Sequence, residues 1–367
     1  MPENKTIARR NLLALGAAGS AALVAAPSIV RAQSTITWKM ATSWPKNAPG
    51  VGVNAQRCAD AIAAMSGGRL KIQFFAAGEL VPPFEVFEAV SAGTVQAGHG
   101  TPYYWQGKDR VFHFFTGVPF GLTAQEHAAW IAFGGGQALW EKAYAPFGVV
   151  PFYAGSSGAQ ATGWFRKEIN SLDDIKGLKM RIAGLGAEIM RRLGASVVLT
   201  PPGEIFAAMQ SGAVDAAEWI GPWNDLAFGL YRVAKFYYLR PFHELGPALE
   251  FIVNKGAYDA LPADLKEVVK RAAMASAYES LADFTFHNIV SLEPLLAKEG
   301  VQMKTMPDDV LRAMGQQSET ILAELGAGSP LAKEIFDSFT GFRKKAIAYG
   351  RESEGVIHSV RIAALGT

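Results

Sequence analysis

Several patterns that mark common classes of enzyme are missing from this sequence of 367 residues. It has a single cysteine, Cys58, which excludes an intrachain disulfide. Neither the Gly-x-x-x-x-Gly-Lys loop of nucleotide-binding enzymes nor the Gly-x-Ser-x-Gly elbow of hydrolases occurs. His243-Glu244 begins like a zinc-protease motif, but Pro247 stands where the second histidine belongs. The sequence therefore offers no constellation of base and nucleophile for catalysis.

The first 32 residues have the pattern of a secretory signal peptide. Arg9 and Arg10 precede an uncharged apolar run, Leu12–Ala26, which is too short to span a bilayer with margin. Val30-Arg31-Ala32 then supplies small residues at the two positions that a signal peptidase reads. Cleavage after Ala32 predicts a periplasmic protein. The paired arginines favour the twin-arginine export route, with the Sec route as the alternative.

Acidic and basic residues are nearly equal in number once this leader is removed. The whole chain has a formal net charge of +2, and the leader carries four basic residues against one acidic residue, so the mature chain is at −1. We therefore expect no nucleic-acid-binding face. The remaining length of about 335 residues suits two lobes, and no later run of eighteen apolar residues indicates a membrane span.

Strand and helix patterns alternate along the mature chain. Apolar and polar residues alternate in 36–40 and 70–74, and a helical pattern over 51–65 separates these two strands. Cys58 lies in that helical pattern and is expected to be a buried, inert thiol. The alternation continues to about residue 254 and predicts an α/β fold with mostly parallel strand pairing.

The sequence pattern becomes mostly helical in the last third of the chain. Pro262 suits the first turn of a helix, and helical periodicity continues to about Ala297, with a kink or break expected at Pro294. A short strand is expected over 301–306, and residues 308–364 are expected to be helical. No low-complexity linker occurs, so the two lobes should be joined by several chain crossings.

One glycine pattern indicates a different class of protein. Gly184-Leu185-Gly186 connects a predicted strand to a predicted helix, as in dinucleotide-binding folds. The third glycine of that fingerprint would stand at Ile189, and the acidic residue about twenty positions further on, Glu204, falls in a helical segment. An NAD-dependent oxidoreductase is therefore kept as the distant alternative.

The segment 169–219 carries a resemblance to a known family. The chain resembles the solute receptors of tripartite ATP-independent periplasmic (TRAP) transporters, the DctP family, over nearly all of its mature length. The resemblance rests on four groups of residues, which are Ile169–Arg181, Leu193-Gly194-Ala195, Gly203–Ala216, and the shorter pieces Gly68–Ile72, Gly78-Glu79-Leu80 and Ala89–Thr94.

This resemblance implies a two-lobe periplasmic-binding-protein fold with a ligand cleft between the lobes and a long helix that spans both. The boundaries it suggests are 33–157 for the first part of lobe 1, 158–246 for lobe 2, 247–310 for the return to lobe 1 with the long helix, and 311–367 for C-terminal helices. Some members pair by exchanging a C-terminal helix, so a homodimer through Leu331–Arg351 is a hypothesis. The implied partners are a small organic acid and the membrane permease subunits.

Two further segments indicate the branch of the family. His99–Trp105 and Glu218–Asp225 resemble the branch that binds 2-oxo acids, such as pyruvate, or lactate. A receptor for another organic acid, a dicarboxylate or a sugar acid, is the first alternative. A receptor for an ABC importer or for a chemosensor would share the fold class.

Arg181 is the leading candidate for binding the ligand. It lies on the predicted strand 177–183, on the opposite face from Met180 and Ile182, and a guanidinium can hold a carboxylate by two parallel hydrogen bonds. The resemblance assigns it that role, against the alternative of a surface arginine.

The resemblance also implies a metal cation beside the substrate carboxylate, held by Gln160, Glu218, the carbonyl of Trp219 and Glu244. The Trp219 ring would form a wall of the ligand site. Two glutamates, one substrate carboxylate and Arg181 sum to −2, which calcium would neutralise and sodium would not, so calcium is slightly favoured. If Glu244 points away, sodium fits equally well.

Tyr103 and Tyr104 follow a predicted strand of the first lobe. A phenol at either position could donate a hydrogen bond to the keto or hydroxyl oxygen of the substrate. Aromatic packing at the hinge between the lobes is an equally favoured alternative role for these tyrosines. The neighbouring aromatic residues suggest an apolar pocket suited to a short aliphatic acid.

Overall fold

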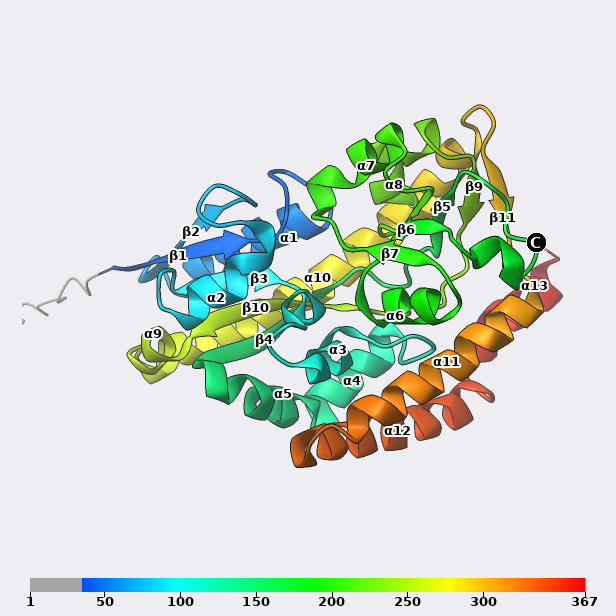
Figure 1. Cartoon of the computed structure of the whole chain (residues 1–367). Coiled ribbons are helices and arrows are strands. Elements are labelled where there is room, and N and C mark those ends of the chain that lie inside the picture. The colour runs from blue at the N-terminus through cyan, green and yellow to red at the C-terminus, as the bar shows by residue number, and fades with distance from the viewer. Residues whose placement is uncertain (1–34, 367) are drawn as a thin grey trace, which may run out of the picture. The chain divides into compact units, whose positions relative to one another are not determined.

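The strands of the chain are divided between two sheets (Figure 1). The computed structural model describes residues 35–366, so the predicted signal peptide lies outside the described residues. The first sheet has the order β2-β1-β3-β10-β4, with β1 (Ile36–Thr42), β2 (Leu70–Phe75), β3 (Ala97–Gly100), β4 (Val149–Ser156) and β10 (Ala248–Asn254). The second has the order β11-β9-β5-β8-β6-β7, with β5 (Gly163–Phe165), β6 (Lys179–Arg181), β7 (Ser196–Val198), β8 (Ala216–Ala217), β9 (Phe236–Tyr238) and β11 (Gln302–Lys304).

Both sheets are mixed, with five parallel and four antiparallel pairings among the described strands, so the predicted excess of parallel pairing is small. In the first, β1 pairs in parallel with β2 and β3, with Met40 opposite both Phe74 and Ala97. Strand β10 runs antiparallel to β3 and β4. In the second sheet β5 is the strand that runs antiparallel to its neighbours, β8 and β9. Strands β5 and β10 each follow a crossing from the other lobe, and each runs antiparallel to both of its neighbours.

Helices cover the sheets, and their starts follow ordinary capping chemistry. Thr123 and Glu126 form a capping box at the start of α4, and the Ser329 hydroxyl accepts from the Ala332 amide at the start of α12. The helices of the first lobe are α1 (Val51–Met65), α2 (Val86–Ser91), α3 (His113–Thr116), α4 (Ala124–Phe133), α5 (Gly136–Tyr144) and α9 (Lys255–Asp259), and those of the second are α6 (Gly184–Arg192), α7 (Ile205–Ser211) and α8 (Pro222–Phe228). The C-terminal part forms α11 (Asp308–Gly326), α12 (Pro330–Gly350) and α13 (Ile357–Leu365).

The predicted long helix is α10 (Ala263–Leu296), which has 34 residues. It packs against β4 and α1 in the first lobe and against α8 in the second, so it spans both. Small buried residues such as Ala272, Ala273 and Ser276 let α1 approach closely, and Cys58 is fully buried there with its thiol pKa raised to about 12 by burial. Pro294 lies in the last turn, where the helix continues to Leu296 rather than breaking. The α/β two-lobe prediction with a spanning helix is confirmed.

Two chain crossings between the lobes lie side by side. The Gln160 amide donates to the Glu244 carbonyl at 2.9 Å, and the Ala161 amide donates to the Ile220 carbonyl at 2.8 Å. A further hydrogen bond joins the lobes themselves, because the fully buried Asn224 of α8 donates to the Pro49 carbonyl, before α1, at 2.8 Å. These contacts hold the two lobes in a closed arrangement.

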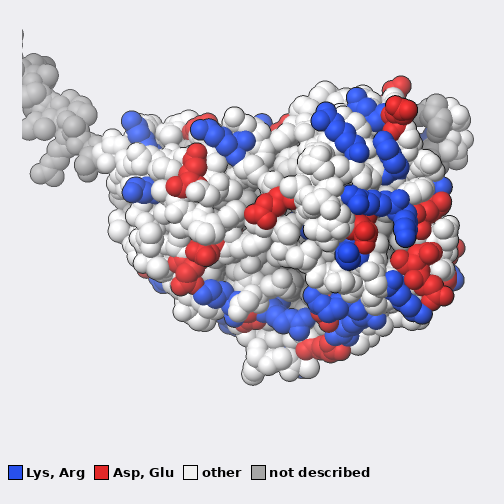
Figure 2. Space-filling model, turned by 45° about the horizontal axis from the view of Figure 1, so that its top comes forward, with Lys and Arg blue, Asp and Glu red and all other residues white. Residues whose placement is uncertain are grey.

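The described surface agrees with the balanced composition. On the face in Figure 2, acidic and basic side chains are interspersed rather than gathered into one large patch of a single sign. Within residues 35–366 the longest apolar helical stretches fall short of what crossing a bilayer requires.

Glu250 on β10 is a fully buried carboxyl of the first lobe. It accepts hydrogen bonds from the Trp105 indole and from the Tyr144 hydroxyl, at 3.0 Å for the latter, and no basic side chain of residues 35–366 pairs with it. Burial raises its carboxyl pKa to about 8. The folded state therefore holds a proton that the unfolded state releases near its ordinary value of 4.5.

Glu250→Gln mimics the protonated carboxyl and should flatten the dependence of stability on pH. The wild type loses stability as pH rises from about 4.5 to 8, since the folded state binds more protons there, by at most about 1.4 kcal/mol per pH unit for one group. Urea unfolding at pH 5 and pH 8 measures the free energy of unfolding of both proteins. An equal loss in wild type and variant would contradict the assignment of Glu250.

Candidate functional site

A small pocket, with about 20 Å³ of space open to a water-sized molecule, lies between the two sheets. Its walls come from the ends of strands and from the crossing segments of both lobes. All seven residues predicted from the sequence line it, and the complete lining is Trp44, Val51, Thr101, Tyr103, Tyr104, Ser157, Gln160, Arg181, Glu218, Trp219, Ile220, Glu244, Pro247 and Leu249. A pocket that is mostly apolar with a few convergent polar groups is the usual form of a small-molecule site.

An ion pair forms the base of the pocket. Arg181, the last residue of β6, and Glu218, just after β8, are each about 1% exposed. Arg181 Nη1 donates to the carbonyl of Glu218 at 2.6 Å and to its Oε2 at 2.7 Å. The backbone fixes this pair, because the Glu218 amide donates to the Arg181 carbonyl at 3.0 Å beside the parallel β6–β8 ladder.

Part of the Arg181 guanidinium is left without strong partners. Its Nε has none among the described residues, and its Nη2 makes one long bond, 3.4 Å, to the Thr200 carbonyl. Buried donors are normally hydrogen-bonded, so this edge can hold an anion. The Trp219 ring lies 5.8 Å from the guanidinium carbon and borders the same space.

Two acceptors that face the pocket also lack partners within the described chain. The Glu244 side chain is 2% exposed, and neither of its carboxylate oxygens makes a hydrogen bond of normal geometry, although the Tyr103 phenol lies close enough to lower its pKa in part. Gln160 donates from its Nε2 to the Ser157 hydroxyl at 2.9 Å, which leaves its Oε1 free. Burial and then the charge of Glu218 raise the pKa of Glu244 to about 7. Unpaired buried oxygens of this kind fit a hard cation.

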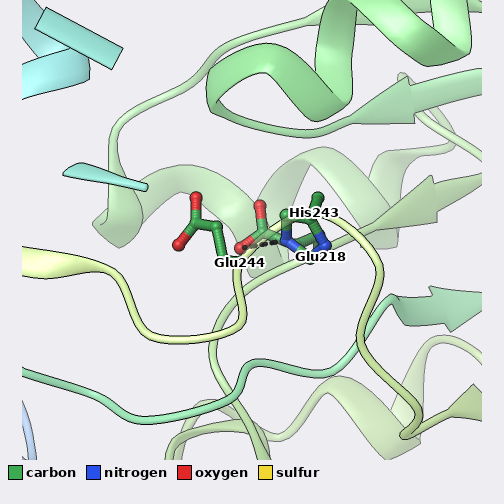
Figure 3. Close-up of side chains that lie close together, drawn as sticks. All are labelled: Glu218, His243 and Glu244. Atoms are coloured by element: carbon green, nitrogen blue, oxygen red, sulfur yellow. Dashed lines mark ion pairs between the residues drawn. The ribbon is translucent and has the colours of Figure 1, made fainter. Parts of the chain in front are cut away.

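His243 completes a cluster of possible metal ligands (Figure 3). One ligand atom each from Glu218, His243 and Glu244 lie within 4.8 Å of one another. His243 Nε2 is 3.6 Å from Glu218 Oε1, and neither ring nitrogen has a hydrogen-bond partner among the described residues. The histidine and Glu244 are neighbours on the segment between β9 and β10, whereas Glu218 comes from the end of β8.

The two tyrosines come from the first lobe and face the charges of the second. Burial raises the pKa of both phenols, so both remain hydrogen-bond donors. The charge of Glu244 raises the pKa of Tyr103 further, and the nearby Arg181 partly lowers that of Tyr104. Their rings pack edge to face at 5.1 Å. Both phenols thus lie near the same three charged groups of the opposite lobe, Arg181, Glu218 and Glu244.

The glycine pattern that suggested a dinucleotide site has a packing explanation here. A side chain at Gly184, where φ is +63°, would contact the Tyr103 ring at 3.3 Å. One at Gly186 would approach His243 Cβ to 2.8 Å. Both glycines therefore allow α6 to approach the pocket residues closely.

Nothing in the sequence indicated the lining residues Trp44, Thr101 and Ser157. His243 lies beside the pocket rather than in its lining, and its place next to Glu244 in the chain is the signal that could have found it. Trp44 donates to His99 at 2.9 Å, so it is held in the pocket wall by a histidine of β3. No spacing in the sequence reveals that contact.

The fold and the site together define a two-lobed receptor whose cleft closes around a small polar ligand. The profile of bacterial extracellular solute-binding proteins of family 7, DctP, matches residues 40–328. The chain therefore belongs to the DctP family of TRAP solute receptors. The resemblance to TRAP receptors is confirmed. The family match favours this class over a receptor for an ABC importer or for a chemosensor.

Similar proteins of known specificity agree with this class. The chain is 43% identical over 319 residues, 87% of each protein, to the monocarboxylate 2-oxoacid-binding periplasmic protein of Nostoc sp.. Two TRAP solute-binding proteins of known structure are similar, one from Pseudoalteromonas atlantica with bound sodium and pyruvate and one from Colwellia psychrerythraea with bound calcium and pyruvate. They are 36% and 37% identical, each with a TM-score of 0.86 over 89% of this chain and 99% of that one.

A third similar structure contains a different acid. It is a TRAP solute-binding protein of Bordetella bronchiseptica, a mixed-occupancy dimer with calcium and picolinate at one active site. It is 33% identical, with a TM-score of 0.88 over 91% of this chain and 99% of that one.

Arg181 and Glu218 should be energetically coupled. Removing one partner of a buried pair leaves an uncompensated charge and costs about 3–5 kcal/mol, whereas replacing both costs much less. We expect Arg181→Met and Glu218→Gln each to lower the free energy of unfolding, and the double variant to lose clearly less than the sum. Urea unfolding of the four proteins measures this. Additive losses would contradict a direct pair.

Proposed function

We propose that this receptor binds a small monocarboxylate, a 2-oxo acid such as pyruvate or else lactate, together with a metal cation, and delivers it to the membrane permease. The observation that carries the proposal is the set of unpaired polar atoms facing one closed pocket: Arg181 Nε, Gln160 Oε1 and both oxygens of Glu244. Donor and acceptor atoms of both kinds lie there, which suits an anion and a cation bound side by side. The chain performs no chemistry on its ligand.

Arg181 is the proposed carboxylate-binding residue. Its unpaired Nε and weakly paired Nη2 can donate to one carboxylate in a forked arrangement, while Nη1 stays on Glu218. Tyr103 and Tyr104 are the proposed donors to the keto or hydroxyl oxygen at the second carbon. Because these phenols belong to the other lobe, binding draws the lobes together and excludes water.

The proposed cation ligands are Gln160, Glu218, the Trp219 carbonyl and Glu244. Oxygen ligands of this kind suit calcium or sodium, and the cation would neutralise the carboxylates that the fold buries. With a bound monocarboxylate, Arg181 and two glutamates leave a charge of −2, so calcium is slightly favoured. The two pyruvate-bound relatives hold one of these ions each.

Apolar walls favour a short monocarboxylate over a dicarboxylate. Val51, Ile220, Pro247 and Leu249 line the pocket, and Arg181 is its one basic side chain among the described lining residues. A second carboxylate would have to lose its hydration against this apolar wall without a partner. Other organic acids are the alternative that the ligand panel below tests.

We also propose a cellular location for the mature protein and boundaries for its two lobes. Export by residues 1–32 would bring the mature chain to the periplasm, where DctP receptors act. The lobe boundaries at 157/158 and 246/247 stay our proposal, and both fall on the paired crossing segments of Gln160 and Glu244.

A panel of acids tested by thermal unfolding of the metal-stripped mature protein identifies the ligand. Pyruvate, longer 2-oxo acids, lactate and succinate are each added with calcium, sodium or chelator. Ligand at about one hundred times its dissociation constant adds about 2.7 kcal/mol, which raises the midpoint by a few degrees. We expect the largest shift with a monocarboxylate and calcium. If no acid shifts the midpoint with either ion, the proposal fails.

Matched variants separate the site from general charge effects. Arg181→Met should abolish the shift, and Glu244→Gln should reduce its dependence on the cation. Arg271→Met is the control, because Arg271 lies exposed on α10 in an ion pair with Glu267. A shift that survives Arg181→Met would contradict the role of this arginine.

We further propose that the receptor forms a homodimer through its C-terminal helices. Large apolar side chains are exposed at the end of α12, within the segment Leu331–Arg351 that the resemblance suggests, and beyond it over residues 356–365, which makes this a candidate interface. They are Ile347, Tyr349, Val356, Ile357, Val360, Ile362 and Leu365. The related receptor of Bordetella bronchiseptica is described as a dimer.

Light scattering of the mature protein should give twice the chain mass. Placing charges in the exposed patch, as in Val360→Asp with Leu365→Asp, should shift the mass to that of a monomer, because each charge would be buried unpaired in the dimer. Phe133→Asp, at a residue 94% exposed on α4, is the control and should stay dimeric. A monomeric wild type would end this proposal.

A further inference from the structure

His243 is the buried polar group that the proposed function leaves unused. Its side chain is fully buried, yet neither Nδ1 nor Nε2 makes a hydrogen bond among the described residues. A buried imidazole without partners is costly, because each ring nitrogen has lost its water. Its position is fixed closely, since Gly186 packs on its Cβ and Phe242 lies at 5.0 Å.

The geometry around this imidazole fits a metal ion with a preference for nitrogen. His243 Nε2 and Glu218 Oε1 are 3.6 Å apart. Two ligand atoms bound to one tetrahedral zinc ion at about 2.0–2.1 Å each lie roughly 3.4 Å from each other. Glu244 adds a third ligand atom within 4.8 Å of both, close enough to reach the same ion after a small rotation of its side chain. In Figure 3 the three side chains lie together in the same small region.

We propose that His243, Glu218 and Glu244 form a nitrogen- and oxygen-containing site for zinc or a similar first-row transition metal, which competes with the hard cation of the proposed function. The inference rests on the proposed cation site for Glu218 and Glu244, and the imidazole is its new element. Imidazole suits zinc, copper, nickel and iron, whereas calcium and sodium take oxygen ligands. His243 is therefore the residue that would let the site bind a transition metal in place of calcium or sodium.

The charges permit this occupancy. Zinc with Glu218 and Glu244 is neutral, and Arg181 brings the sum to +1, so a bound monocarboxylate again leaves zero. A transition metal can thus replace calcium without an extra buried charge. Glu218 can serve both groups, because its Oε2 is bonded to Arg181 while its Oε1 faces His243.

Zinc binding to the untagged, metal-stripped mature protein tests the inference without any organic acid. Isothermal titration with zinc alone should show one tight equivalent in the wild type. His243→Gln should weaken the affinity for zinc by more than tenfold. His287→Gln, which alters the half-exposed histidine paired with Asp283 on α10, is the control and should bind zinc like the wild type.

A spectroscopic measurement keeps the test independent of how the variant folds. X-ray absorption of the wild-type zinc complex should show one imidazole in the coordination shell. A shell without imidazole, or equal zinc affinity in wild type and His243→Gln, would overturn the inference. If zinc binds through His243 while no organic acid binds with any cation, the inference stands and the proposed function fails, so the two failures are distinguishable.

Discussion

The pocket of this receptor depends on the burial of two carboxylates beside one guanidinium. Arg181 offsets Glu218 directly, but Glu244 stands about 2% exposed without a hydrogen bond, and its pKa is raised to about 7. A buried carboxyl of this kind is kept either by taking up a proton, as Glu250 does, or by lying beside a compensating charge. A cation and an anionic ligand together supply that compensation, which connects the charge of the site to its proposed function.

The two-lobe fold makes this compensation depend on closure. The charged groups belong to strand ends and crossing segments of the second sheet, whereas Tyr103 and Tyr104 come from the first lobe. The hydrogen bond from Asn224 to the Pro49 carbonyl joins the lobes when they close. In the proposed function, ligand, cation and closure form one coupled equilibrium, in which each stabilises the others.

The sequence predicted the parts of the fold and site that depend on local pattern. Alternating residues located β1, β2 and β6, and helical periodicity located α10, while the motif around Arg181 indicated the family. Mixed pairing escaped prediction, because the direction in which β5 and β10 enter their sheets is set by the chain crossings. His243 escaped as well, since its burial beside Glu218, twenty-five positions away in the chain, arises only in the folded protein.

Coupling between the organic acid and the cation tests the central claim most directly. Isothermal titration would measure the affinity for pyruvate in metal-stripped protein with and without calcium, and the affinity for calcium with and without pyruvate. Linkage requires each ligand to strengthen the other by the same factor, and a shared site predicts a factor of at least about ten. A pyruvate affinity that does not change with calcium or sodium would contradict a site built to bury both charges together.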